Sequence, residues 1–372
     1  MRTYEVTLVP GDGSGPELVD AARSVLDHAA RLSGFKIDWD VHQAGQRALA
    51  ESESLLPDAT LNSIRTNGAA LKGPTTTPIG TGHRSVNITI RQELDLYACL
   101  RPVRSLPIAS TQEEPERPHV DLVVVRENTE DVYAGLEYPK GSPGARAVVQ
   151  ALGALGRPLP ADTAVSLKPF TPHGCERVVE FAFNHAARHG RKLVESVCDA
   201  RRYPATEGMF ARVASKVAAR HPSIASRTVP VPALCADLVR APGRHDVLVL
   251  PNLYGDIISD VTAALVGSLG VAPGANIGAH HAVFEATHGS APEFAGSGRL
   301  NPTALIFSGC MLLDHLGEHE TAARIRAAVE DVVAAGEVLT FDLLAPQRSA
   351  DAATTVEFTR AVTDRLGPVA RP

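Results

Sequence analysis

A short apolar run that passes directly into a helix start constrains the fold of this chain most. Val247–Leu250 is apolar throughout and predicts a buried strand. The segment after it, L-P-N-L-Y-G-D-I-I-S-D, leads into helical spacing through Val261 and Leu265. Similar alternation follows the strand predicted at residues 4–10, where an amphipathic helix at 18–32 precedes a strand at 36–42. These alternations predict an α/β fold.

Two acidic residues stand at the start of the helix after Val247–Leu250. A helix that begins near Gly255 would place Asp256 and Asp260 on one face, one turn apart. Two carboxylates this close repel unless a cation lies between them, and hard oxygen ligands suit Mg2+ or Mn2+. The alternative is a solvated pair at a helix N-terminus, where the helix dipole favours acids.

Length and composition narrow the class of protein. A chain of 372 residues predicts two lobes or domains, and 44% hydrophobic with 21% charged residues is typical of a globular protein. The net charge of −6 argues against nucleic acid but permits anionic small molecules. No apolar run is long enough to cross a membrane. The cysteines are odd in number, scattered and without C-x-x-C spacing, which predicts reduced thiols in the cytoplasm: Cys99, Cys175, Cys198, Cys235 and Cys310.

Two loops are candidates for ligand contact. Residues 10–17, P-G-D-G-S-G-P-E, form a glycine-rich turn after a strand, but neither G-x-G-x-x-G nor G-K-[ST] is present. This turn alone therefore does not predict a phosphate site. Residues 69–80 run from a short strand into a loop rich in hydroxyls, Thr77 among them. That loop is either an ordinary Pro/Gly turn or a set of donors that face a substrate or cofactor.

Three arginines lie in or beside apolar strand patterns. Arg91 and Arg101 flank an apolar segment, and Arg126 ends the run V-V-V-R. Arginines in such positions are not expected to be buried without anionic partners. Each alone could be a structural ion pair, but together with Ser85 and Asn87 they suggest a trap for a polycarboxylate.

Several of these motifs occur in one order along the whole chain. They are residues 10–17, 72–80, 85–104, 126–135, 252–260, 272–278 and 285–302. In this order they resemble the metal-dependent decarboxylating dehydrogenases that act on isocitrate, 3-isopropylmalate, homoisocitrate and tartrate or malate. Within that family, residues 85–104 are similar to the form of this motif found in isocitrate dehydrogenases, S-x-N-x-x-x-R-Q-E-L-D-L-Y-A-C-L-R-P-V-R.

The resemblance implies a fold and an assembly. The expected fold is a two-lobed α/β structure of the isocitrate/isopropylmalate dehydrogenase type, which is not a Rossmann fold. A large cofactor lobe would comprise residues 1–98 and 267–372, and a small substrate and dimerisation lobe would comprise 99–266. A clasp-like arm at about 131–171 would hold a second subunit in a homodimer. By composition alone, residues 140–160 could equally be a mobile loop.

The resemblance also implies residue roles. Tyr133 would handle a proton at the enol stage, and Asp256 and Asp260 would bind Mg2+ or Mn2+. The residues that would hold substrate carboxylates are Ser85, Asn87, Arg91, Arg101 and Arg126. The residues that would contact the cofactor are Thr77, Asn276, His288, Gly289, Ala291, Glu293 and Asn301.

Glu293 favours NAD over NADP. An acid here can accept hydrogen bonds from both ribose hydroxyls, whereas a 2′-phosphate would meet a like charge. The NADP-dependent members of the family usually carry lysine and tyrosine where this chain has Glu293 and Phe294. No arginine occurs in residues 340–346, where some NADP-dependent members have one.

The chain departs from the family pattern at two positions. The family has a lysine that reaches across the dimer interface where this chain has Asp199, and a metal-binding aspartate, also contributed across the interface, where it has Pro232. A shifted alignment is the simplest explanation, but residues 207–232 keep the isocitrate-type spacing without a gap. The candidate replacements are Asp199 or Asp237 for the metal ligand and Arg201 or Arg202 for the cation; Asp199 could also accept the proton.

Three hypotheses follow from these departures. The chain could be an active NAD-dependent enzyme on an altered 2-hydroxy acid, such as one with a phosphonate group, in specialised metabolism. It could pair with a paralogue that supplies the lysine and the aspartate. It could also be a regulatory or binding subunit that holds a dicarboxylate or nucleotide without turnover.

Overall fold

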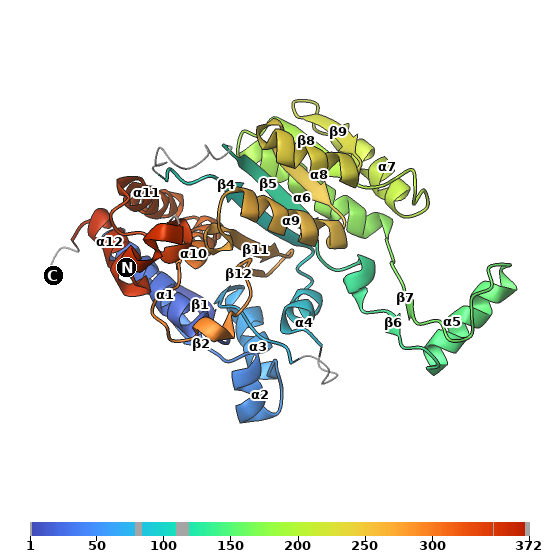
Figure 1. Ribbon diagram of the computed structural model, residues 1–372, viewed down its shortest axis with the longest axis horizontal. Helices are drawn as coiled ribbons and strands as arrows, with labels where there is room; N and C mark the ends of the chain where they lie inside the picture. The colour runs from blue at the N-terminus through green and yellow to red at the C-terminus, as the bar shows by residue number, and fades with distance from the viewer. Residues whose placement is uncertain (1, 79–83, 109–118, 345, 369–372) are drawn as a thin grey trace.

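A long mixed sheet organises the protein, as the computed structural model shows for residues 2–78, 84–108, 119–344 and 346–368 (Figure 1). The strand order is β2-β1-β3-β12-β11-β4-β5-β10-β8-β9. In chain order these strands are β1 (Arg2–Val9), β2 (Phe35–Val41), β3 (Ala69–Lys72), β4 (Ala98–Arg104), β5 (Asp121–Glu127), β8 (Leu193–Val197), β9 (Ala225–Val229), β10 (Val247–Leu250), β11 (Pro273–Ile277) and β12 (Ala282–Ala286).

The sheet has a parallel group at each end. Strands β2, β1, β3 and β12 pair in parallel, and so do β5, β10, β8 and β9. Between the two groups, β11 and β4 make antiparallel pairings with their neighbours. This arrangement differs from the mostly parallel Rossmann sheet, so the predicted α/β, non-Rossmann fold is confirmed.

Helices cover both faces of the sheet. One buried cluster packs α1 and α8–α12 against one face. On the other face, one cluster lies under α6 and α7 and a second lies beside α3 and α4. The helices are α1 (Gly15–Leu32), α2 (Gln46–Ser52), α3 (Asp58–Asn67), α4 (Val86–Glu93), α5 (Pro143–Ala154), α6 (Pro172–Arg188), α7 (Glu207–Ala218), α8 (Val231–Arg240), α9 (Asn252–Leu265), α10 (Thr303–His315), α11 (His319–Ala335) and α12 (Thr355–Leu366).

Two local predictions need correction. The helix that carries Asp256 begins at Asn252 rather than near Gly255, because Pro251 precedes it and the Asp131 carboxylate accepts the N–H of Leu253 at 3.0 Å. Arg91 lies in helix α4 rather than beside a strand. The alternation in S-V-N-I-T-I resembles a strand, but the buried residues Val86 and Ile90 follow helical spacing.

Residues 137–166 form a segment that projects from the rest of the molecule (Figure 1). It consists of β6 (Glu137–Tyr138), α5 and β7 (Val165–Ser166), and the two strands pair antiparallel. We call this segment the arm. The stretch that could have been a mobile loop by composition therefore contains a helix, whereas the lobe boundaries and the clasping role stay predictions.

Two findings complete the fold. Among the described residues, no helix is long and apolar enough to cross a bilayer. Ile79 and Gly80, at the end of the hydroxyl-rich loop, and Ala345, in the segment that lacks an arginine, lie outside the described residues.

Candidate active site

Arg126 lies at the carboxyl end of β5, where its register partner is Leu250, the last residue of β10. The side chain is only 2% exposed. Its Nε donates to the Asn252 Oδ1 at 2.8 Å, and its Nη1 donates to the Asp256 carboxylate. Burial, followed by repulsion from Arg91, lowers the pKa of Arg126 to about 10, which still leaves it cationic at neutral pH. A buried cation at the ends of parallel strands is suited to recognise an anion.

Asp256 and Asp260 lie together on α9, as the sequence predicts. The Arg101 Nη1 is 4.0 Å from the Asp256 Oδ1 and 3.6 Å from the Asp260 Oδ1. Burial alone would raise the pKa of Asp256, but Arg126, the Tyr133 hydroxyl and Arg101 together lower it. Burial raises the pKa of Asp260, although that side chain is 63% exposed. Asp260 therefore lies at the open end of the site.

Tyr133 joins this group from a short 3-10 helix, η1 (Asp131–Ala134). Its hydroxyl donates to the Asp256 Oδ2 at 2.6 Å, and the Arg126 guanidinium lies 5.1 Å from the centre of its ring. Burial and then the hydrogen bond to Asp256 raise the pKa of Tyr133. The hydroxyl is therefore protonated at neutral pH and can donate a proton.

A second charged group was not predicted from the sequence. Lys72 and Glu285 are register partners on β3 and β12, and their side chains form a buried ion pair at 2.6 Å. Arg91 lies 3.5 Å from the same carboxylate, and Asn276 donates to it at 2.8 Å. Burial opposes ionisation of Glu285, but Lys72 and Arg91 outweigh it and lower its pKa to about 2. Lys72 and Glu285 are each a charged residue within an apolar strand pattern, and this sequence signal could have identified both of them.

Ser85 and Asn87 lie at the start of α4, the helix that carries Arg91. Ser85 is the N-cap residue of α4, and Asn87 accepts a hydrogen bond from the Thr75 hydroxyl at 3.3 Å. Arg84, next to Ser85, donates to the Ala134 carbonyl at 3.2 Å, which brings this end of α4 to η1 and Tyr133. The structure thus places Ser85 near Tyr133. Among the described residues, no hydrogen bond or ion pair joins the side chain of Ser85 or Asn87 to that of Arg91, Arg101 or Arg126.

The glycine-rich turn has a structural role here. Ser14 N–H donates to the Ser290 carbonyl at 2.7 Å, and Gly15 N–H donates to the Asp12 carbonyl at 2.8 Å. A Cβ at Gly13 would lie 2.3 Å from the Ser290 carbonyl oxygen, so only glycine fits. The buried Asp12 carboxylate accepts the N–H groups of Gln46, Arg47 and Thr76 at 2.9, 3.1 and 2.7 Å. The turn is therefore hydrogen-bonded both to the loop that contains Thr76 and to the loop that contains Ser290.

The comparison with protein families decides the identity of the fold and site. A model of the isocitrate/isopropylmalate dehydrogenase family matches residues 5–362. The chain belongs to the isocitrate/isopropylmalate dehydrogenase family. Membership supports a decarboxylating dehydrogenase that uses a nicotinamide cofactor and a divalent metal.

Relatives in this family include both cofactor types. The chain is 42% identical over 361 residues to the mitochondrial isocitrate dehydrogenase [NAD] catalytic subunit 5 of Arabidopsis thaliana, covering 97% of this chain and 88% of that protein. It is 38% identical over 379 residues to the isocitrate dehydrogenase [NADP] of Archaeoglobus fulgidus, covering 96% and 91%. A crystal structure of isocitrate dehydrogenase from Methylococcus capsulatus superposes with a TM-score of 0.86 at 40% identity, covering 98% of this chain and all of that one.

Except for Asn276 on β11, the predicted cofactor residues lie on loops or short 3-10 turns of this dehydrogenase fold. Glu293 is exposed in η4 (Pro292–Phe294), and the neighbouring Phe294 stacks on Phe341 with ring centroids 5.9 Å apart. Ala291 has a left-handed backbone with φ of 37°, and a Cβ at Gly289 would meet no atom within 4 Å. The loop from His288 to Phe294 is thus open on one side, which suits an extended ligand.

Three of the predicted cofactor residues, Asn301, Asn276 and Thr77, differ in their burial and in their hydrogen-bond partners. The Asn301 carboxamide donates to Asp342 at 3.0 Å and accepts the Thr303 N–H at 3.0 Å, so its backbone is freer than its side chain to meet a ligand. Asn276 is buried, and its side chain donates a hydrogen bond to the Glu285 carboxylate. Thr77 is half-buried in the threonine loop.

Among the described residues, neither Asp199 nor Pro232, the two positions predicted to depart from the family pattern, forms a hydrogen bond or ion pair with Asp256. Asp199 N–H donates to the buried Glu207 at 2.5 Å, and its carboxylate is 3.4 Å from Arg202. Pro232 is exposed on the first turn of α8, and Asp237 pairs with Arg240 at 3.5 Å. Within the residues that the structure describes, no group of three His, Cys, Asp or Glu side chains could hold a metal ion. A site that binds metal through three protein carboxylates would need one from elsewhere.

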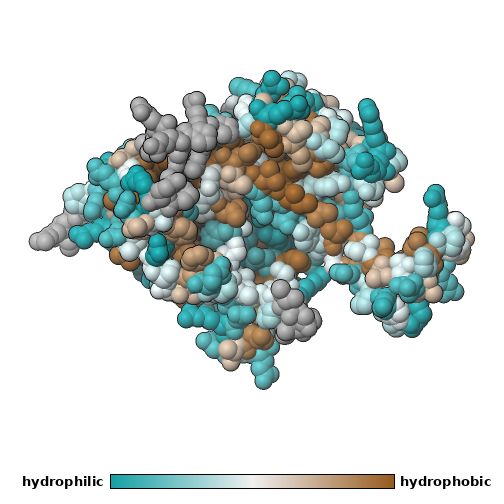
Figure 2. Space-filling view, in the orientation of Figure 1, coloured by the Kyte–Doolittle hydropathy of each residue, from teal (hydrophilic) through white to brown (hydrophobic). Residues whose placement is uncertain are grey.

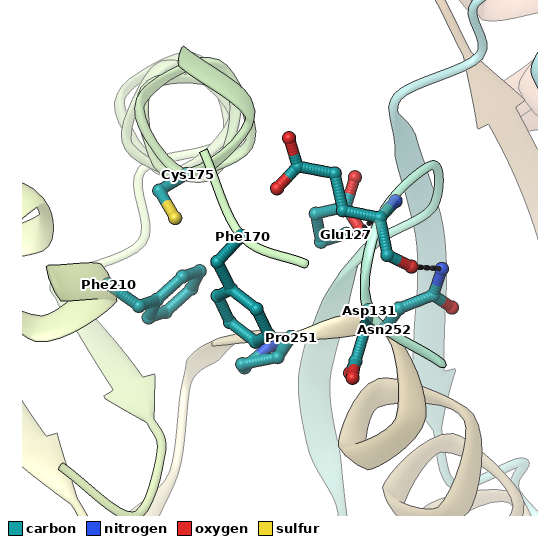
Figure 3. Close-up of a pocket in the computed structure, with 8 residues that line it drawn as sticks. Glu127, Asp131, Phe170, Cys175, Phe210, Pro251 and Asn252 are labelled. Carbon is teal, nitrogen blue, oxygen red and sulfur yellow. Dashed lines mark hydrogen bonds between the residues drawn. The ribbon is translucent and has the colours of Figure 1, made fainter. Parts of the chain in front are cut away.

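A narrow pocket lies behind the active site (Figure 3). Asn252 and the acids Glu127 and Asp131 line one side of it, and Phe170 and Phe210 line the other. It is too narrow to hold a substrate. We therefore assign it to the packing that supports α9 and η1.

Proposed function

We propose that the chain catalyses NAD-dependent oxidation of an isocitrate-like 2-hydroxy polycarboxylic acid, with decarboxylation. An anionic analogue such as a phosphonate is the alternative substrate. The observation that carries this proposal is the convergence of two buried arginines, Arg101 and Arg126, on Asp256 beside Tyr133. Such a group can bind an anionic acid and supply a proton at the same place.

Substrate recognition would use the arginines. Arg91, Arg101 and Arg126 each contact an acidic side chain. Substrate carboxylates would compete for these guanidinium groups, which remain charged and form fork-shaped hydrogen bonds. The site would thereby select acids with several carboxylate or comparable anionic groups.

A divalent cation fits Asp256 and Asp260. Mg2+ and Mn2+ are commonly held by one or two carboxylates and completed by water or substrate oxygens. The lowered pKa of Asp256 keeps that carboxylate ionised and available. When bound, the cation supplies Lewis acidity toward the substrate oxygens.

Proton transfer would involve two side chains. NAD, when bound, would supply the hydride acceptor. Oxidation of the substrate hydroxyl would also need a base to take its proton, and we assign this task to Asp199 of a second copy. After carbon dioxide departs, the enol carbon needs a proton. Tyr133 would supply it, since its raised pKa keeps the hydroxyl protonated.

The cofactor would be NAD. Glu293 is exposed on the open loop and can accept hydrogen bonds from ribose hydroxyls, whereas it would repel a 2′-phosphate. The relatives include NAD and NADP enzymes, so this preference rests on Glu293 and Phe294.

We further propose that two copies of the chain assemble. Apolar surface gathers over α8 and α9 (Figure 2), where Val239 is 73% and Ile257 is 52% exposed. The arm also carries exposed apolar residues, including Leu155 at 77%. Contiguous apolar surface of this kind is typical of an interface. All five cysteines are free, and the cytoplasmic location stays a prediction.

Asp199 and Pro232 support two alternative roles. If neither residue can replace the family lysine and aspartate, the chain would need a paralogue to supply them, or it would bind ligand without turnover. A regulatory subunit of this kind would keep Arg101, Arg126 and Tyr133 for binding alone.

One experiment separates the three roles. The purified chain is assayed for NADH formation with NAD, Mn2+ and a panel of 2-hydroxy diacids and triacids, including a phosphonate. Turnover by the chain alone supports the proposed enzyme. Turnover only after a paralogue is added supports a mixed assembly, and saturable binding without turnover in either condition supports a regulatory subunit.

A further inference from the structure

The first residue of α9, Asn252, contacts both the anion site and the loop beside it. Its side chain is almost fully buried, with 1% of the residue exposed. The Oδ1 accepts the Nε–H of Arg126 at 2.8 Å. The Nδ2 donates to the Glu130 carbonyl at 3.0 Å, a hydrogen bond drawn as a dashed line in Figure 3. Both ends of one carboxamide are therefore engaged.

The geometry at Arg126 explains why a neutral partner is useful. Within the described residues, Arg126 donates hydrogen bonds from Nε to Asn252 and from Nη1 to Asp256. An amide oxygen fixes the orientation of the guanidinium plane without adding negative charge. An acid in place of Asn252 would give the guanidinium a second counter-charge and compete with an anionic ligand.

The loop that anchors Asn252 is itself fixed. Asp131 is 2% exposed and has a left-handed backbone with φ of 65°, which is uncommon for a residue other than glycine. Its carboxylate accepts the Leu253 N–H at 3.0 Å, and its own N–H donates to the Pro169 carbonyl at 3.1 Å. The Glu130 carbonyl that receives Asn252 is thus held against the first turn of α9.

We propose that Asn252 is a positioning residue for anion recognition: it links Arg126 to the Glu130 carbonyl and so aims the guanidinium into the site while leaving it charged. Asn252 acts through Arg126 and does not touch the substrate. This inference rests on the proposed function only in that Arg126 binds a substrate carboxylate.

The first test needs no substrate. In protein labelled with 15N-arginine, the Arg126 Nε–H signal is assigned by its loss in Arg126→Lys. We expect Asn252→Ala to speed hydrogen exchange of this Nε–H at least about tenfold, because its acceptor is gone. Asn252→Asp keeps the acceptor and should keep the slow exchange. An unchanged Arg126 signal in Asn252→Ala would overturn the proposal.

A matched control is available on the surface. Asn62 accepts a hydrogen bond from Arg65 Nη1 at 3.2 Å, but both side chains are exposed on α3. Asn62→Ala should leave the Arg126 signal and ligand affinity unchanged. Thermal unfolding of each variant confirms that the comparison is between folded proteins.

The second test is a double-mutant cycle on binding of DL-isocitrate with Mn2+, measured by calorimetry. We expect Asn252→Ala to weaken binding about tenfold or more alone and less than about threefold in the Arg126→Ala background. Equal losses in both backgrounds would show a general structural role and overturn the proposal. If the unmodified protein binds neither isocitrate nor any acid of the panel, the proposed function fails, while the exchange test still decides the role of Asn252.

Discussion

The role of Tyr133 can be tested by one substitution that removes its hydroxyl and keeps its ring. Its hydroxyl donates to Asp256 at 2.6 Å, and its raised pKa keeps it protonated at neutral pH. We expect Tyr133→Phe to lower kcat by about 10²- to 10⁴-fold with little change in KM, because the phenyl ring retains the packing but not the proton. Steady-state kinetics with the preferred substrate measure this change.

Tyr138→Phe is the matched control, since Tyr138 lies in the arm on β6. It should leave kcat unchanged. A Tyr133→Phe enzyme with unaltered kcat would show that the proton at the enol stage comes from another group.

Glu285 should make the stability of the protein dependent on acid pH. Its folded-state pKa is about 2, against an ordinary value of 4.5, because Lys72 and Arg91 outweigh the effect of burial. Between these two pH values the unfolded chain takes up a proton that the folded protein does not. The free energy of unfolding contributed by Glu285 is therefore complete above pH 4.5 and is lost as the pH falls toward 2.

The Glu285→Gln variant tests this contribution. It should be less stable at neutral pH and should show a shallower decline of stability with acid pH than the unmodified protein, as measured by urea unfolding. Parallel curves for the two proteins would assign the acid dependence to other carboxylates.

The sequence predicted which residues belong to the active site better than it predicted the side chains that these residues contact. Arg101 and Arg126 could be found because each is a charged residue in an apolar pattern, and Asp256 because it lies four residues from Asp260 on a predicted helix. Tyr133 was predicted only through the resemblance to the family, and the structure brings all four residues together. The Lys72–Glu285 pair was missed because its members are 213 positions apart in the chain. Their proximity depends on which strands are neighbours in the sheet, which local patterns do not show.

At the scale of elements, buried strands and amphipathic helices were predicted most accurately. Val247–Leu250 has the predicted bounds, and the helix predicted at residues 18–32 is α1, Gly15–Leu32. The start of α9 was wrong because the Asp131 carboxylate, from a distant loop, accepts the Leu253 N–H. Arg91 was placed beside a strand because a short alternating pattern also fits one face of a helix.

The cofactor loop gives a prediction at this scale. Glu293→Lys should lower the ratio of kcat/KM for NAD to that for NADP about tenfold or more, since the variant exchanges repulsion of a 2′-phosphate for attraction. Initial rates with each cofactor measure the ratio. Glu320→Lys, at an exposed acid on α11, is the control for a change of net charge. Equal ratios in the Glu293→Lys and unmodified proteins would contradict the assignment of Glu293.

At the scale of the whole molecule, exposed apolar residues on α8 and α9 are typical of an interface. Val239 on α8 and Val356 on α12 are both 73% exposed, so they form a matched pair. We expect Val239→Glu to shift the protein toward monomer and to lower activity, because a charge would lie in the proposed interface. Val356→Glu should do neither.

Sedimentation equilibrium of both variants measures this effect. A dimer that survives Val239→Glu unchanged would place the interface elsewhere. The sequence could predict an assembly only through its resemblance to a family, because the apolar surface on α8 and α9 becomes visible only when the helices are packed on the sheet.

The central claim is that Asp256 and Asp260 form a metal site on which turnover depends. The direct test is the initial rate of NADH formation, with the substrate selected from the panel, as Mn2+ is returned to protein treated with a chelator. We expect no turnover without metal, a saturable rise as Mn2+ is added, and half-saturation at about tenfold or more higher Mn2+ in Asp256→Asn. Turnover that is equally fast with and without Mn2+ would contradict the claim and return the two aspartates to a structural role on α9.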